Sequence, residues 1–225
     1  MKLNWKLERQ PWQTGDASPK KIALAFGVLT FAIFAMPLVM HHLLGKRLAI
    51  GDILLLCTIP GLGAYGFFTV SKLPLRGLQL KDGAWFILLS LLTMLTVGGV
   101  NCVWQAGLTA LDIPFEAEQS AVGMVRDSSG IGLWKLFFAL CVFTPLIEEL
   151  LFRRIVYGFL LRFGFWKAFF GTALLFSVCH FFIGGVGGLF ILGVGFQLMY
   201  LRFRNLGASV LLHALINASA FFISI

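Results

Sequence analysis

One apolar stretch decides the fold: residues 132–161 read GLWKLFFALCVFTPLIEELLFRRIVYGFLL. The run is long enough to span a membrane, yet it carries Glu148, Glu149 and Arg153. Each charge at the centre of a membrane helix costs roughly 2.5 to 3.5 kcal/mol, so three charges facing lipid would cost on the order of 8 to 10 kcal/mol. These side chains must therefore face one another or water. Ionisable groups in such a place indicate a functional site by default.

The composition places the chain among the membrane proteins. Of its 225 residues 59% are hydrophobic and only 12% charged, and the mean hydropathy is +0.90. Soluble domains do not have this composition. Apolar runs of about transmembrane length predict an all-α, polytopic membrane helical bundle of about seven helices. The predicted helices are residues 22–40, 53–70, 84–104, 132–161, 168–183, 186–201 and 206–225.

The fifth and sixth predicted helices are short. Residues 184–188, Gly-Gly-Val-Gly-Gly, join them in a sequence that breaks helices and lets backbones approach closely. The two helices can therefore form a hairpin that does not fully cross the membrane.

The positions of lysine and arginine predict the topology. Basic residues gather in the amino-terminal tail and in alternate loops, and few lie on the other side. The positive-inside rule then places the amino terminus in the cytoplasm and the carboxyl terminus outside. We expect residues 1–21 to form a cytoplasmic interfacial tail and residues 22–225 to form the membrane domain. The net charge of +8 is explained by topology and attraction to anionic lipid, so no nucleic-acid partner is expected.

The fourth helix could end at Arg153 or continue to Leu161. The depths of the polar residues in the membrane favour continuation. At 1.5 Å per residue, Glu148 lies about 21 Å along the helix from Arg162, and His180 lies about 20 Å along from Lys167. Counted from Arg204, His213 lies about 14 Å along its helix. Continuation therefore brings the polar groups to similar depth, at the expense of a long helix that must tilt.

Helical spacing assigns these residues to faces. Glu149 and Arg153 are four residues apart and can form an ion pair, while Glu148 points about 100° away toward another partner. His213 and Asn217 also share a face. The ring of Phe176 can pack on His180, one turn away. We expect Glu149, Arg153 and Phe176 to support the site and not to take part in its chemistry.

This set of groups suits the addition of water to an amide. A carboxylate near a neutral imidazole in a water-poor cavity is a suitable general base. A second imidazole and a carboxamide supply donors for the oxyanion that develops on the carbonyl. Ser177 and Cys179 are weaker candidates, because no helical spacing aims either of them at His180.

Three motifs occur in order across consecutive hydrophobic segments: EExxxR at 148–153, FxxxH at 176–180 and HxxxN at 213–217. In this the chain resembles the CPBP intramembrane proteases, which include the type II CAAX prenyl endopeptidases and the bacterial Abi proteins. The resemblance covers residues 144–218. The family often has eight helices, so it leaves seven or eight open for this chain.

The resemblance implies a glutamic-type intramembrane endopeptidase. In it Glu148 activates water with help from His180, and His213 and Asn217 form the oxyanion site. The implied partners are the lipid bilayer and a membrane-embedded or lipid-anchored peptide or protein substrate. The small chain with its short tail further favours the inner membrane of a bacterium, where CaaX prenylation is not expected.

No cofactor is expected, although zinc remains an alternative. Glu148, Glu149, His180 and His213 could in principle form a His-His-carboxylate zinc site with an open position. The chain lacks the HExxH spacing that places two histidines one turn apart on the same helix.

Two other classes of function stay open at this point. A non-catalytic membrane protein could use the same polar pocket to bind a peptide, as in bacteriocin immunity. A proton-coupled carrier could use glutamate and histidine as a relay. The carrier is less favoured because the chain has neither symmetric repeats nor paired broken helices.

Overall fold

The computed structural model describes residues 82–225 without a break and eight further residues in the range 24–55. The predicted tail at 1–21 and the predicted helices at 22–40 and 53–70 lie outside this continuous stretch. All regular structure in residues 82–225 is helical, which confirms the predicted fold class. The helices are α4 (Gly83–Ala110), α5 (Ser120–Arg126), α6 (Gly130–Phe138), α7 (Thr144–Glu149), α8 (Tyr157–Leu160), α9 (Phe165–Val178), α10 (Val186–Phe203) and α11 (Leu206–Ser224).

Shorter helical segments complete the chain trace. Two π-helical segments, η3 (Ala139–Phe143) and η4 (Leu150–Val156), lie before and after α7. A 3-10 turn, η5 (Leu161–Phe163), follows α8, and another, η6 (Ile183–Gly185), precedes α10. Together α6, η3, α7, η4, α8 and η5 form one continuous helical rod, Gly130–Phe163.

Four helices in the described part of the chain are long and apolar enough to cross a membrane. They are Gly83–Ala110, the rod Gly130–Phe163, Ile183–Phe203 and Leu206–Ser224. The rod has 34 residues and continues past Arg153, as depth predicted. By contrast α9 has 14 residues and is about 21 Å long, too short to cross a hydrocarbon core of about 30 Å. The fifth predicted helix is thus short, as predicted, whereas the sixth is not: Ile183–Phe203 has 21 residues and is long enough to cross.

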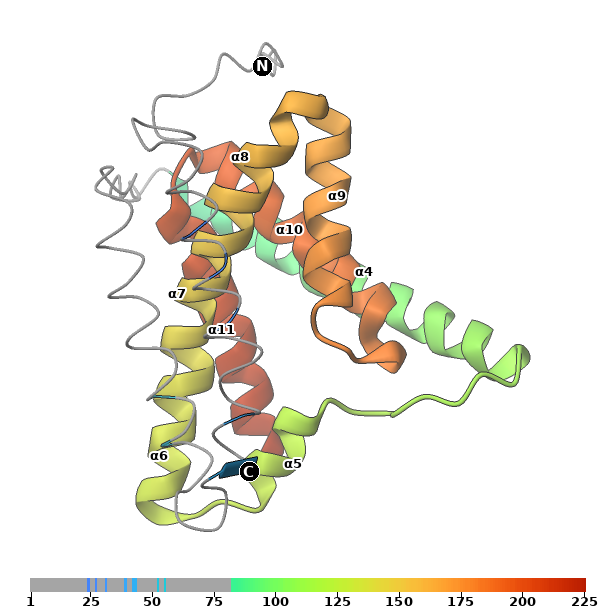
Figure 1. The fold of residues 1–225 in the computed structure, drawn as a ribbon, viewed down its shortest axis with the longest axis vertical. Helices are drawn as coiled ribbons and strands as arrows, with labels where there is room; N and C mark the ends of the chain where they lie inside the picture. The colour runs from blue at the N-terminus through green and yellow to red at the C-terminus, as the bar shows by residue number, and fades with distance from the viewer. Residues whose placement is uncertain are drawn as a thin grey trace.

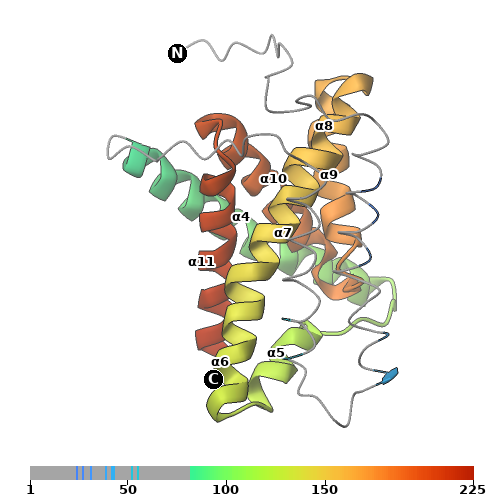
Figure 2. The same ribbon diagram turned by 60° about the vertical axis from the view of Figure 1, so that its left-hand side comes forward.

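The rod packs lengthwise against α11, although the two are far apart in the sequence (Figures 1 and 2). At one end of the rod the chain turns at Gly164, whose φ is +108°, and descends as α9. Next α10 packs against α9, α4 and α11, so it is the central helix of the described part. The long helix α4 crosses behind the others at a steep tilt (Figure 1).

Glycine lets α10 approach its neighbours closely. A Cβ atom at Gly193 would lie 2.9 Å from the Cα atom of Ala173 in α9. Backbone contact at this distance excludes any larger residue, because the obstacle is main chain that cannot rotate away. The result is a tight α9–α10 pair next to His180.

The turn between α9 and α10 is held by the carboxyl-terminal part of α4. The Trp104 indole donates a 2.8 Å hydrogen bond to the carbonyl of Ile183, and Gln105 Nε2 donates a 3.0 Å bond to that of Gly184. The backbone N–H of Gly188 donates to Asn101 Oδ1 at 3.3 Å. These bonds satisfy backbone groups that a broken helix leaves unpaired. They also fix the segment that follows His180.

Candidate active site

The two glutamates lie on a single short α-helical segment between two π-helical ones. Glu148 and Glu149 end α7, with η3 before it and η4 after it. Both side chains are buried. A π-helical turn shifts the hydrogen-bond register by one residue, and such bulges occur frequently at functional sites. Here the two register shifts fall on either side of the carboxylates.

Glu149 is the fully buried hub of an ionic cluster. Its Oε2 accepts a 2.8 Å bond from Nε of Arg153, and its Oε1 lies 3.5 Å from Nη2 of the same guanidinium. Its Oε1 also lies 3.2 Å from Nδ1 of His213 on α11. Both carboxylate oxygens therefore have partners. The ion pair predicted from the four-residue spacing is present, and the contact with His213 was not predicted.

Glu148 faces both histidines. Its Oε2 lies 3.7 Å from Nε2 of His213 and 4.0 Å from Nε2 of His180, and it accepts no hydrogen bond from the described residues. These separations are too long for direct hydrogen bonds. One water molecule with bonds of about 2.8 Å can bridge 4.0 Å. The structure thus brings the side chains of Glu148, His180 and His213 together.

The backbone sets the tautomer of neutral His180. Its Nδ1 lies 2.7 Å from the carbonyl of Phe176. A carbonyl oxygen only accepts, so Nδ1 carries the proton, and in the neutral ring Nε2 has a lone pair. That lone pair is on the nitrogen nearest to Glu148. The Phe176 ring packs on the imidazole at a centroid distance of 4.7 Å.

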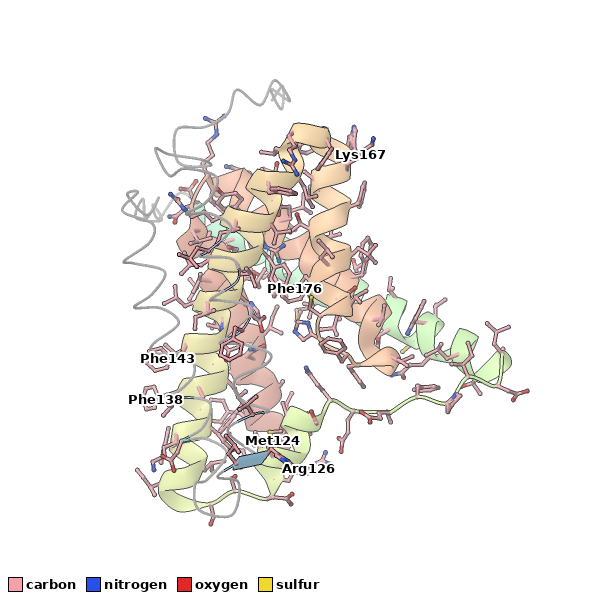
Figure 3. The ribbon with its side chains drawn as sticks, viewed as in Figure 1. Met124, Arg126, Phe138, Phe143, Lys167 and Phe176 are labelled. Carbon is pink, nitrogen blue, oxygen red and sulfur yellow. The ribbon has the colours of Figure 1, made fainter. Side chains whose placement is uncertain are left out.

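Aromatic rings form the walls of the site. The fully buried Phe196 ring stacks on His213 with centroids 4.5 Å apart and an angle of 18°. The guanidinium of Arg153 lies 5.4 Å from the centre of the Phe176 ring and 5.7 Å from that of Phe196. Sequence reasoning missed Phe196, since nothing local separates it from the other phenylalanines among the 24 in the chain. Figure 3 places Phe176 well along α9, away from Lys167 at the α8–α9 turn.

Asn217 has a different neighbour from the other predicted residues. Its Nδ2 donates a 2.8 Å hydrogen bond to the backbone carbonyl of Leu140 in η3. The side chain is therefore anchored to the rod, one helical turn beyond His213. Asn217 and His213 share a face of α11, as their spacing predicted.

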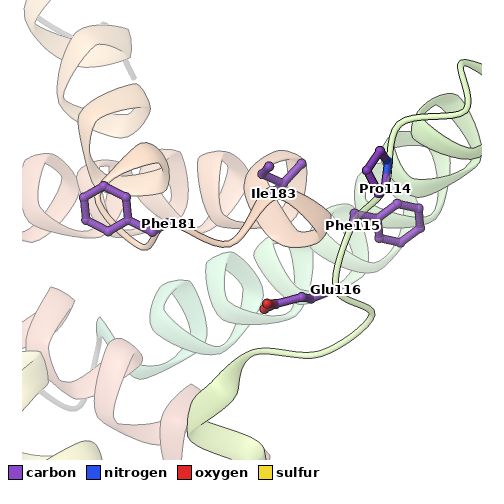
Figure 4. A pocket seen from close by; sticks show the side chains of 5 residues that line it. All are labelled: Pro114, Phe115, Glu116, Phe181 and Ile183. Carbon is purple, nitrogen blue, oxygen red and sulfur yellow. The ribbon is translucent and has the colours of Figure 1, made fainter.

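A hollow of about 380 Å³ lies beside the segment that follows His180 (Figure 4). The loop Pro114–Phe115–Glu116 lines one side, and Phe181 and Ile183 line the other. Phe181 is 82% exposed and has a φ of +49°, which is uncommon for a bulky side chain. Phe181 follows His180 directly in the sequence.

Glu149 is a poor zinc ligand in this arrangement. A ligand carboxylate needs a free oxygen lone pair aimed at the metal, but Glu149 already holds Arg153 and His213. Across the part of the chain that the structure describes, no three His, Cys, Asp or Glu side chains form a group that could hold a metal ion.

Comparison with known families agrees with the motifs. Residues 130–219 match the family described as type II CAAX prenyl endopeptidase Rce1-like. These residues are therefore similar to an Rce1-like domain. The domain begins with α6 and ends within α11, so it contains Glu148, His180, His213 and Asn217. No curated protein and no solved structure matches the chain.

The Rce1-like domain confirms the resemblance to the CPBP intramembrane proteases that the motifs carried. With the four candidate spans it identifies the chain as an integral membrane protein. The matching family is described as a type II CAAX prenyl endopeptidase family, so the match supports an intramembrane peptidase at family level.

Proposed function

We propose that the chain hydrolyses a peptide bond of a membrane-associated protein, using a water molecule that Glu148 activates. One observation carries the proposal. Glu148 Oε2 is buried, has no hydrogen-bond donor among the described residues, and lies within 4.0 Å of two imidazole nitrogens. A buried carboxylate oxygen without a partner is costly, so its retention is best explained by a ligand that binds there during turnover.

In the proposed first step a water molecule donates one hydrogen bond to Glu148 Oε2 and the other to Nε2 of His180. Glu148 takes the proton while the water oxygen attacks the carbonyl carbon of the substrate. The tautomer of His180 supports this role, because the Phe176 carbonyl holds the proton on Nδ1 and leaves Nε2 to accept. His180 is thus proposed to orient the water.

The substrate oxygen becomes an oxyanion as the carbon turns tetrahedral. We propose that the His213 ring and the Asn217 amide donate to this oxyanion. The contact of Glu149 with His213 Nδ1 turns Nε2 of the ring toward the site. In the last step the intermediate collapses, the C–N bond breaks, and Glu148 returns its proton to the departing amine.

The proposed mechanism is glutamic-type and independent of metal. Its support is the fit described above, since Glu149 is engaged by Arg153 and His213. The proposed orientation keeps the amino terminus in the cytoplasm and the carboxyl terminus outside. The α8–α9 and α10–α11 turns, with Lys167 and Arg204 nearby, lie at the same end of the bundle (Figure 1). A bacterial inner membrane is the proposed location.

The substrates we propose are a peptide precursor that is cleaved during maturation and a protein with a carboxy-terminal hydrophobic anchor. Membrane proteomes of the parent and deletion strains would be compared for a protein that keeps its hydrophobic tail in the deletion. A candidate would then be incubated with the purified protein in liposomes.

The deciding variant is Glu148→Gln, which keeps shape and loses the base. We expect it to lower kcat about 10² to 10⁴-fold with unchanged folding, the usual contribution of a general base. Glu118→Gln is the matched control, since Glu118 lies in an exposed pair with Arg126. Full turnover by Glu148→Gln would refute the proposal. If neither wild type nor variant cleaves but both retain the peptide, the chain is a binding protein.

A further inference from the structure

One backbone carbonyl in the rod has no backbone partner, and the sequence explains why. In η3 the N–H of Thr144 donates to the carbonyl of Ala139, five residues earlier, and thereby passes over Leu140. The next residue is Pro145, which has no N–H to donate. The π-helical register and the proline together therefore leave the Leu140 carbonyl without a main-chain donor.

Asn217 supplies the missing donor. Its Nδ2 lies 2.8 Å from the Leu140 carbonyl oxygen, across the contact between the rod and α11. In a hydrocarbon environment water cannot satisfy such a carbonyl, so the bond to Asn217 matters. A carboxamide nitrogen carries two protons, and this bond uses one of them.

We propose that the Leu140 carbonyl and Pro145 are positioning groups for Asn217. The carbonyl fixes the plane of the carboxamide and leaves the second Nδ2 proton for the oxyanion. This inference rests on the proposed function for its catalytic part only. Pro145 lies at the start of α7, three residues before Glu148. In this proposal the same proline also leaves the Leu140 carbonyl free to hold Asn217.

A thermal double-mutant cycle tests the anchor without any substrate. Asn217→Ala leaves the Leu140 carbonyl unpaired, so the melting temperature in detergent should fall. Pro145→Ala restores an N–H at position 145 that can serve the same carbonyl. In the Pro145→Ala background, Asn217→Ala should therefore lower the melting temperature by much less. An equal fall in both backgrounds would overturn the anchor.

Two further variants complete the thermal experiment, one as a second test of the hydrogen bond and one as a control. Asn217→Leu keeps roughly the size and has no donor, so it should lose stability as Asn217→Ala does. Wild-type stability in Asn217→Leu would overturn the anchor even if Pro145→Ala failed to fold. Ser219→Ala is the control on the same helix, since its exposed hydroxyl donates only to its own turn at Leu215. It should leave the melting temperature unchanged.

The catalytic part is read from kcat and KM. Asn217→Ala should lower kcat about 10² to 10³-fold, the usual loss for one oxyanion donor. Pro145→Ala should lower kcat about tenfold with KM unchanged, and it should add nothing in the Asn217→Ala background. If the losses in kcat of the two single variants multiplied in the double variant, the positioning role would be overturned. If the wild type cleaves nothing, the proposed function fails while the thermal cycle still decides the anchor.

Discussion

His213 Nδ1 lies 3.2 Å from Glu149 Oε1, so the carboxylate accepts the ring proton and turns Nε2 toward Glu148. The glutamate that pairs with Arg153 thus also orients a histidine from a helix 64 residues away in sequence. Glu149 therefore both stabilises the buried Arg153 and orients His213.

Arg153→Ala should strongly destabilise the protein. It leaves the fully buried Glu149 without its cationic partner, which costs about 3 to 5 kcal/mol. Arg126→Ala breaks an exposed pair and should cost less than about 1 kcal/mol. Unfolding of both variants in detergent gives the comparison. Equal stability of the two would contradict the assignment of Arg153 to structure.

Phe196→Leu should impair turnover more than stability. The Phe196 ring stacks on His213, and an aromatic pair contributes about 0.5 to 1.5 kcal/mol beyond burial. Without the ring, the imidazole is less well oriented, and we expect kcat to fall about tenfold. Phe170→Leu is the control, because Phe170 is half exposed and lies apart from the site. Unchanged kcat in Phe196→Leu would show that Glu149 alone orients His213.

Gly193→Ala should destabilise the α9–α10 pair. The added Cβ would lie 2.9 Å from a backbone atom of Ala173, and overpacking of this kind costs about 1 to 3 kcal/mol. Gly98→Ala meets nothing within 4 Å and should be neutral or stabilising by about 0.5 to 1 kcal/mol, since glycine weakens a helix interior. Opposite shifts in melting temperature are expected. A Gly193→Ala protein as stable as wild type would show that the two helices can separate freely.

Phe181→Ala should raise KM with little effect on kcat. Phe181 lines the hollow beside His180 and is 82% exposed, so we expect its ring to contact the substrate chain. Loss of one buried aromatic contact predicts a rise in KM of about tenfold or more. Phe163→Ala, an exposed aromatic at the other end of α9, is the control. An equal KM in both variants would show that the substrate does not contact the hollow.

Zinc should be absent from the active enzyme. Elemental analysis of purified, active protein is expected to find less than stoichiometric zinc, and chelators should leave kcat unchanged. Metal-dependent hydrolysis requires a coordinated water. Stoichiometric zinc that is lost with activity on chelation, and regained with it on zinc addition, would replace the glutamic mechanism by a metal one.

Much of the bundle could be predicted because its signals are local. The lengths of the apolar runs predict the long helices in residues 82–225. The depths of the polar residues in the membrane predict that the fourth helix continues past Arg153. The fifth helix was placed at 168–183 and is observed at Phe165–Val178, because the chain turns at Gly164 and the helix ends before His180. Helix boundaries depend on such turns more than on hydropathy.

By itself the sequence determined that the chain is a helical membrane protein, and it determined which polar residues share a helical face. Both follow from hydropathy and from the fixed rise and rotation of a helix. Only the tertiary structure decided which atoms meet: His213 with Glu149, Phe196 with His213, and Asn217 with the Leu140 carbonyl. The π register that frees this carbonyl differs from an α register by one residue in each hydrogen bond. The rod and α11 meet at this carbonyl, and their contact joins residues too distant in sequence for any local pattern to record.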